Sequence, residues 1–371
     1  MIYLDNAATT PLTPGVIDAM TSVMTEVFGN PSSIHRYGRS ASQLLRENRQ
    51  IISDLLETPA RNIIFTSGGT ESNNMAIQGY ALANQDKGKH LITTAIEHHS
   101  VLHEMAYLEE RFGFEVTYLQ PDAQGTITPD MLQAALREDT ILVSTMYANN
   151  ETGQLLPIKE FGEILANHQA VFHVDAVQVM GKVAVKPEEL GIDLMSASAH
   201  KFHGPKGTGF LYAKPLHMDP LLHGGEQEDK RRASTENMVG ITGMAKALQE
   251  AYQNMDQSFN RIQTLKTDFL AQLDTLNYYL NGPSTGLPHV INIGFPGKNN
   301  GLLLTQLDLA GIAVSTGSAC TAGAVDPSHV LTALYGKDSN RLDESIRISL
   351  SDQTQEEELS TLATKLKEIL A

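Results

Sequence analysis

The segment DLMSASAHKFHGPKGTGFLYA (193–213) decides the fold class of this 371-residue chain. Its pattern predicts a strand at 193–200, a loop that carries Lys201, and a second strand at 207–213. Further strand candidates precede it, at 62–66, 90–96, 114–119, 140–147 and 170–175. Amphipathic helical patterns lie among them, at 101–112, 129–137 and 158–168. This alternation, with several strands almost continuously apolar, predicts an α/β protein whose mostly parallel sheet is covered by helices on both faces.

The pattern changes after about Met238. A polar-rich helical stretch without proline runs to near Asn281, and it resembles a connecting helix between two domains. Strand candidates at 290–295 and 345–350, with helices around them, predict a smaller α+β unit. Since a domain commonly has about 100–200 residues, the length fits two domains. We expect a large domain at 12–255 and a small domain made of 1–11 and 256–371.

The composition excludes several classes of protein. The 27 Lys and Arg residues stand against 43 Asp and Glu, and the net charge of −16 disfavours direct binding to nucleic acid or to an anionic membrane. No apolar run approaches the ~20 residues that span a bilayer, and the start MIYLDNAATT lacks the features of an export signal. The only cysteine, Cys320, rules out an intrachain disulfide framework and a multi-cysteine metal site. We therefore expect a cytoplasmic protein.

Three motifs follow successive strand candidates and together indicate one cofactor. The turn in FTSGGTESNN (65–74) suits a phosphate at a helix start, although an ordinary turn capped by Thr70 also explains it. Asp175 ends the strand at 170–175 and suits a protonated ring nitrogen, or equally a helix cap, with Gln178 as a neutral neighbour. Lys201 is either a surface lysine or, when desolvated, a nucleophilic amine. A phosphate site, a carboxylate and an amine are what pyridoxal 5'-phosphate (PLP) requires.

Histidines cluster in AIEHHSVLHE (95–104). His99 and His103 are four residues apart, which is compatible with a metal site, but no carboxylate completes the usual zinc-hydrolase arrangement. We therefore expect no metal, and we expect His98 to stack on a flat cofactor ring and to move protons near pH 7.

Two further residues lie in the C-terminal part of the chain. Cys320 lies in STGSACTAG (315–323), where it is either a small buried apolar residue or, in an exposed glycine-containing loop, a reactive thiol. Arg347, in SIRIS (345–349), suits a substrate carboxylate or a surface ion pair. The segment RRASTEN (231–237) is either a phosphate-contacting loop or a solvated turn.

These motifs, in this order, resemble the cysteine desulfurases of the NifS/IscS type, in the class V aminotransferase family of fold type I PLP enzymes. The resemblance covers nearly the whole chain. It also includes YLDNAATTP (3–11), FGNPSSIH (28–35) and NNETG (149–153). It implies a large domain with a mostly parallel seven-stranded sheet flanked by helices, and a small domain that carries a catalytic cysteine loop at about 315–328.

The resemblance also implies roles for individual residues. Lys201 would bind PLP covalently, and Cys320 would be the sulfur acceptor. His98 would stack on the ring and shuttle protons. The other expected cofactor-binding residues are Gly69, Thr70, Asn150, Asp175, Gln178, Ser198, His200 and, from the partner subunit of a homodimer, Thr235. Asn150 and Arg347 would hold the carboxylate of L-cysteine.

The implied activity is the conversion of L-cysteine to L-alanine, with the sulfur held as a persulfide on Cys320. An acceptor protein would then use the sulfur for iron–sulfur cluster assembly or tRNA thiolation. The alternatives are a selenocysteine lyase, another class V aminotransferase-like enzyme, and a non-catalytic sulfur-relay platform. Two departures from the family pattern stand out: Ser234 replaces the usual glycine before Thr235, and the chain ends soon after its last helix. We therefore expect it to lack the C-terminal extension with which housekeeping relatives dock a scaffold protein.

Overall fold

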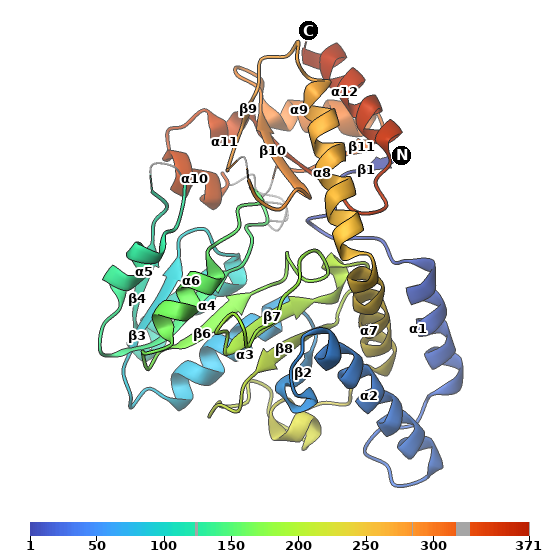
Figure 1. Ribbon diagram of the computed structural model, residues 1–371, viewed down its shortest axis with the longest axis vertical. Coiled ribbons are helices and arrows are strands. Elements are labelled where there is room, and N and C mark those ends of the chain that lie inside the picture. Colours follow the sequence, from blue (N-terminus) through green and yellow to red (C-terminus); the bar gives the residue numbers. More distant parts are fainter. Residues whose placement is uncertain (123–124, 284, 317–326, 371) are drawn as a thin grey trace.

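The computed structural model describes residues 1–122, 125–283, 285–316 and 327–370 (Figure 1). Within them, seven strands form the main sheet in the order β2-β8-β7-β6-β5-β3-β4. Their bounds are β2 (Ile63–Thr66), β3 (His90–Thr94), β4 (Glu115–Leu119), β5 (Thr140–Met146), β6 (Val171–Asp175), β7 (Leu194–Ser198) and β8 (Gly209–Ala213). Strands β7, β6, β5, β3 and β4 run parallel to one another. Strand β8 pairs antiparallel with β7 on one side and with β2 on the other. The predicted mostly parallel seven-stranded sheet is confirmed.

Each face of this sheet packs against its own apolar core because successive strand residues point to opposite faces. Ile64 joins one core and Phe65 the other, and Leu142 and Val143 divide in the same way. The first core contains residues of α3 (Gly69–Ala83) and α4 (His99–Phe112). The second core contains residues of α1 (Pro14–Glu26), α2 (Arg36–Leu55), α5 (Pro129–Ala135), α6 (Ile158–Leu165) and α7 (Met238–Gln253). Helices therefore cover both faces, as predicted. Short 3-10 helices occur at η1 (Ala60–Asn62), η2 (Ala199–Lys201) and η3 (Gln227–Lys230).

The C-terminal elements and the N-terminal strand build a smaller unit with a separate apolar core (Figure 1). An antiparallel sheet of order β12-β10-β9 forms its centre, and β1 pairs parallel with β11. The bounds are β1 (Ile2–Tyr3), α8 (Met255–Ala271), β9 (Tyr279–Leu280), β10 (Val290–Gly294), α9 (Asn300–Leu309), β11 (Ile312–Ala313), α11 (Arg341–Glu344), β12 (Ser345–Ser349) and α12 (Glu356–Leu370). Helix α10 (His329–Tyr335) lies between them in the sequence, but its Val330 joins a core of the large sheet. No helix in the described ranges is long and apolar enough to cross a membrane.

The single connecting helix predicted from Met238 to near Asn281 is wrong. The stretch forms α7 and α8, which are separated at Asn254 (φ −117°, ψ 9°), and it ends in the short strand β9. Residues of α7 pack into the core of the large sheet, whereas residues of α8 pack into the core of the smaller unit. The break at Asn254 therefore lies between a helix that packs into one core and a helix that packs into the other.

Candidate active site

A cavity of about 380 Å³ lies where the carboxyl ends of the central parallel strands meet the start of α3 and the small unit. Ligands of open α/β sheets bind at such strand ends, and this volume is within the range of small-molecule and cofactor sites. The cavity is lined by ten of the predicted site residues, namely Gly69, Thr70, His98, Asn150, Asp175, Gln178, Ser198, His200, Lys201 and Arg347.

The start of α3 forms one end of the cavity. Helix α3 begins at Gly69 with Gly68 as its cap and no side-chain cap, so the alternative that Thr70 merely caps this helix is wrong. A Cβ atom at Gly69 would lie 2.8 Å from Cγ2 of Val177 and 3.5 Å from Cβ of Ser198, so glycine is needed for this close approach. The unpaired N–H groups of the first helical turn, with the hydroxyls of Thr70 and Ser198, suit a phosphate.

His200 lies beside this end of the cavity, and its Nδ1 is 3.2 Å from the Thr9 hydroxyl. Burial, with the charges of Lys201, Lys206 and Lys182, lowers the pKa of His200 to about 4. The ring is therefore neutral at pH 7, and it can donate one N–H to an anion without adding a positive charge.

Asp175 is buried at the end of β6, and both of its carboxylate oxygens accept hydrogen bonds. Oδ1 accepts from the backbone N–H of Val177 at 3.0 Å, and Oδ2 accepts from Nδ2 of Asn73 at 2.8 Å. No helix follows β6 directly, so Asp175 does not serve as a helix cap. Asn73 also donates to the Ser100 hydroxyl at 2.9 Å. Sequence reasoning missed Asn73 and Ser100, although both stand inside quoted motifs, because nothing local shows that they connect two elements.

His98 is the N-cap of α4. Its Nδ1 accepts from the backbone N–H of Ser100 at 3.1 Å and is 2.8 Å from the Ser100 hydroxyl. Because Nδ1 accepts, the proton of the neutral ring is on Nε2. Burial lowers the pKa of His98, and the charge of Lys201 lowers it further, whereas Asp175 opposes the shift. A neutral ring that points one N–H outward can stack on a cofactor and exchange a proton.

Lys201 and Arg347 are each positioned by the N-terminal segment. Nζ of Lys201, in η2, donates to the carbonyl of Ala7 at 2.5 Å and to that of Ala8 at 2.8 Å. Arg347, in β12, is 2% exposed and forms an ion pair with Asp5 at 2.9 Å. Its guanidinium also donates to the Asn150 carbonyl at 3.0 Å. A surface ion pair was one of the two predicted roles of Arg347. The ion pair exists, but it is buried at the cavity wall, so its predicted place at the surface is wrong.

Three further histidines, His99, His103 and His329, form a row. The ring nitrogens of His99 and His329 are 3.1 Å apart, and the rings of His99 and His103 stack with 4.9 Å between centroids. No group of His, Cys, Asp or Glu in the described part of the chain could hold a metal ion. Burial lowers the pKa of His99 and of His329, with neighbouring histidines adding to both shifts.

One predicted residue of the described part of the chain does not line the cavity. Thr235 is exposed and lines a surface hollow with Ser67 and Arg232, not the cavity. Its loop is tied to α3 because Arg232 pairs with Glu71 at 2.7 Å. Ser234 has φ +91°, a conformation that glycine adopts without strain, which explains why a glycine would suit this position.

Cys320 lies outside the described residues. Described residues on either side of its segment contact Arg347 of the cavity wall and Glu151, the neighbour of Asn150. Ser315 exchanges backbone hydrogen bonds with Arg347, and the Ser328 hydroxyl donates to Glu151 at 2.5 Å.

The cavity residues fit PLP. They provide a phosphate cradle that a side chain at Gly69 would fill, a buried carboxylate at Asp175 and an amine at Lys201.

Comparisons with known proteins show the family of the chain. The model of the family described as "Aminotransferase class-V" matches residues 2–362. "Putative cysteine desulfurase IscS 1" of Bacillus subtilis (strain 168) is 48% identical over 100% of this chain and 98% of its own length. "Cysteine desulfurase IscS" of Dictyoglomus turgidum is 47% identical, over 100% of this chain and 94% of its own.

Solved structures are similar over the whole chain. A "NIFS-LIKE PROTEIN" superposes with a TM-score of 0.93 at 36% identity, covering 100% of this chain and 99% of its own. The structure of "SspA in complex with cysteine" superposes with a TM-score of 0.84 at 33% identity, covering 96% of this chain and 100% of its own. The chain therefore belongs to the aminotransferase class-V family, and within it to the PLP-dependent cysteine desulfurases of the IscS type.

Proposed function

We propose that this cysteine desulfurase acts on free L-cysteine, releases L-alanine, and holds the sulfur as a persulfide on Cys320 before an acceptor protein takes it. The observation that carries the proposal is that Lys201, Asp175 and His98 line one cavity together with Arg347. The similar SspA structure is a complex with cysteine, which supports the same substrate class here.

The cofactor end of the site is assigned as follows. Lys201 would carry PLP through Nζ, Asp175 would accept a hydrogen bond from the protonated ring nitrogen, and Gln178 would face the ring oxygen. Thr70, Ser198, His200 and the Gly69 backbone would hold the phosphate. When bound, PLP supplies an electron sink for the electrons of the substrate's Cα–H bond. The hydrogen bonds that Asp175 accepts from Asn73 and Val177 keep the carboxylate oriented without neutralising it.

Arg347 and Asn150 would bind the substrate carboxylate. The guanidinium is already aligned, because Asp5 and the Asn150 carbonyl each accept from it. A guanidinium held by such contacts loses little side-chain entropy when a carboxylate binds. Lys201 Nζ would take the substrate's Cα proton, and His98, which is neutral and carries its proton on Nε2, would move protons on the ring face.

Cys320 would take the substrate sulfur as the Cβ–S bond breaks and an S–S bond forms. It is the only cysteine of the chain, so no second thiol in the same chain can resolve the persulfide. The sulfur must leave to a thiol of another molecule. An iron–sulfur scaffold or a tRNA-thiolation enzyme would supply that thiol, and a reducing cytoplasm would preserve it.

We also propose a homodimer and the domain division 12–255 against 1–11 with 256–371. Large apolar side chains are exposed from the end of α1 to the start of α2, namely Met24, Phe28, Ile34 and Tyr37. Clustered exposed apolar residues mark association surfaces. The exposed Thr235 is available to reach the cofactor of a partner subunit. The separate apolar cores on either side of Asn254 support the domain boundary.

The test uses the purified protein. The wild type should absorb in the visible range as a PLP enzyme and should release sulfide and alanine from L-cysteine with a reductant. Lys201→Ala should lose covalent PLP, whereas Cys320→Ser should keep it and lose sulfide release. Lys337 is exposed, so Lys337→Ala is the control and should keep both the covalent PLP and the release of sulfide. Full activity of Cys320→Ser would exclude the persulfide step. Release of selenide from L-selenocysteine, without sulfide from L-cysteine, would support a selenocysteine lyase. Absence of PLP would leave the relay platform.

A further inference from the structure

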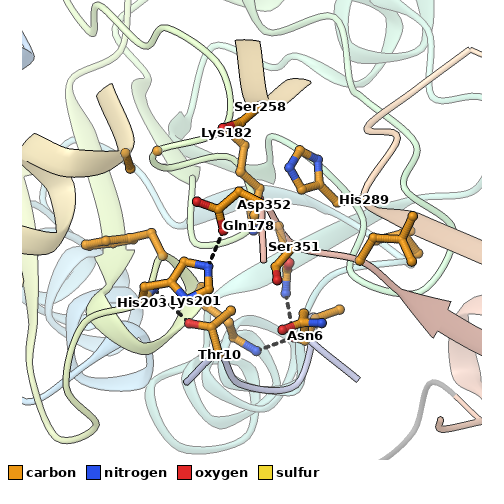
Figure 2. A pocket seen from close by; sticks show the side chains of 16 residues that line it. Asn6, Thr10, Gln178, Lys182, Lys201, His203, Ser258, His289, Ser351 and Asp352 are labelled. Atoms are coloured by element: carbon orange, nitrogen blue, oxygen red, sulfur yellow. Dashed lines mark hydrogen bonds and ion pairs between the residues drawn. The ribbon is translucent and has the colours of Figure 1, made fainter. Parts of the chain in front are cut away.

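Lys201 and His98 are both assigned to the cofactor by the proposed function, but they are held in place differently. Lys201 donates to the Ala7 carbonyl, and both residues line a second cavity of about 40 Å³ (Figure 2). His98 does not line this second cavity. The backbone around His98 is held instead by the first residue of helix α10, His329, which is more than 200 residues away in the sequence.

His329 contacts the residues on both sides of His98. Its Nε2 is 2.8 Å from the carbonyl oxygen of Glu97, and its Nδ1 is 3.1 Å from Nε2 of His99. A carbonyl oxygen only accepts, so Nε2 of His329 carries a proton and donates it. Burial lowers the pKa of both His329 and His99, so both rings are neutral at pH 7. Nδ1 of the neutral His329 ring therefore accepts from Nε2 of His99.

The bond to Glu97 fixes the peptide group that precedes His98. That carbonyl belongs to the same planar unit as the N–H of His98, so holding the oxygen also holds the plane. The Glu97 side chain is 0% exposed and is itself held, because its Oε1 accepts from the Thr94 hydroxyl at 2.7 Å and from the backbone N–H of Met146 at 2.9 Å. The backbone that enters His98 is thus held from three sides.

Helix α4 alone does not provide this support. His98 is the N-cap of α4 and has non-helical backbone angles (φ −63°, ψ 148°), so the peptide group before it lies outside the helix. The contacts of its Nδ1 with Ser100 orient the ring relative to α4 only. A contact from another element is needed to fix the direction in which the chain enters the cap.

The start of α10 is firmly placed and can serve as that element. The Ser328 hydroxyl, at the N-cap of α10, donates to Glu151 at 2.5 Å and accepts from the backbone N–H of Leu331 at 3.0 Å. Val330 and Leu331 are each 1% exposed, and Val330 packs into a core of the large sheet. His329 therefore presents its ring from a fixed backbone.

We propose that His329 is a positioning residue of the desulfurase reaction, which holds the Glu97 carbonyl and the His99 ring and thereby keeps His98 in the orientation that its work on the cofactor requires. This role rests on the proposed role of His98. His329 lines neither cavity, so it acts only through His98.

Two substitutions separate the two contacts. His329→Gln keeps an N–H donor near the position of Nε2, whereas His329→Asn keeps an acceptor near the position of Nδ1 and loses the donor to Glu97. With L-cysteine as substrate, kcat should fall about tenfold in His329→Asn and only about threefold in His329→Gln, with KM within about twofold of the wild type in both. Visible circular dichroism of bound PLP should change in His329→Asn and stay close to that of the wild type in His329→Gln.

A double-mutant cycle tests whether His329 acts through His98. In a His98→Ala background, His329→Asn should lower kcat by less than about twofold and leave the cofactor circular dichroism unchanged. A merely structural role would instead carry its full effect into that background, and such a result overturns the proposal. Equal kcat and equal circular dichroism in His329→Asn and the wild type also overturn it.

His168→Asn is the matched control. The Nε2 of His168 is 3.0 Å from the Arg137 carbonyl, and its Nδ1 accepts from the backbone N–H of Ala170 at 3.0 Å, but it lines neither cavity. Its kcat and circular dichroism should equal those of the wild type. If His329→Asn does not fold, His329→Gln decides alone, since no loss, or a loss that persists without His98, overturns the proposal. A wild type that binds PLP but releases neither sulfide nor alanine refutes the proposed function, and the circular dichroism then still decides the role of His329.

Discussion

Glu228 forms a buried, bidentate ion pair with Arg49 near the turn that precedes α3. It is 7% exposed, and its carboxylate accepts from NH1 and NH2 of Arg49 at 2.7 and 2.6 Å. The same carboxylate accepts from the backbone N–H of Phe65 at 3.0 Å, and the Arg49 guanidinium is 4.5 Å above the Phe65 ring. These contacts tie η3 to β2, directly before the turn at Gly68.

We expect Glu228→Gln to destabilise the protein by about 3 kcal/mol. A glutamine can still accept from Phe65, but it turns an NH2 group toward Arg49 and leaves that cation without a counter-charge. Breaking a buried pair in this way costs about 3–5 kcal/mol. The lower end applies because the Arg49 side chain is 16% exposed and water reaches it in part.

The assay is urea unfolding of the apoenzyme, comparing midpoints at equal slope. Glu226→Gln is the control, because its pair with Lys230 is 80% and 71% exposed and should contribute under about 0.5 kcal/mol. Replacing both partners by leucine should recover part of the loss, since no charge then remains buried. A cost below about 1 kcal/mol for Glu228→Gln, or one equal to that of Glu226→Gln, refutes this reasoning.

Three further predictions concern single substitutions. Burial raises the pKa of Glu97 to about 8. The wild type therefore loses stability as the pH rises from the pKa of Glu97 in the unfolded chain toward 8. Glu97→Gln does not titrate, so its melting temperature relative to that of the wild type should rise between pH 5 and pH 8. Because His203 lowers the pKa of Asp352, that carboxylate stabilises the protein above its unfolded pKa, and thermal melts of Asp352→Asn and the wild type should converge as pH falls to about 3. Gly69→Ala would place a methyl group against Val177, so fluorescence titration should show PLP binding about tenfold weaker, and an unchanged Kd would contradict the cradle.

Much of the large sheet was predictable because its physics is local. Residues such as Leu142 and Val143 are apolar in succession, since both faces of a covered parallel sheet are buried. The strand boundaries were correct to within about two residues. The break at Asn254 was not predictable, because no proline or glycine marks it and only the presence of two cores requires it.

The candidate site divides in the same way. Its chemical groups were visible in the sequence because phosphate, ring nitrogen and aldehyde each require a particular residue type near a strand end. The supporting contacts were not visible. Each of these contacts joins segments that are about 100 or more residues apart. They are the hydrogen bonds from Asn73 to Asp175, from Arg232 to Glu71 and from Lys201 to the Ala7 carbonyl.

Hydrophobic periodicity and side-chain chemistry act over a few residues, so they already indicate which residues can do chemistry and near which strands these residues lie. Only the tertiary structure decided how those residues are oriented and charged. Arg347 meets Asp5 from 342 residues away, and Lys201 meets the Ala7 carbonyl from 194 residues away. Burial and the approach of like charges set the proton affinity of such groups, and both arise only when two apolar cores pack against each other.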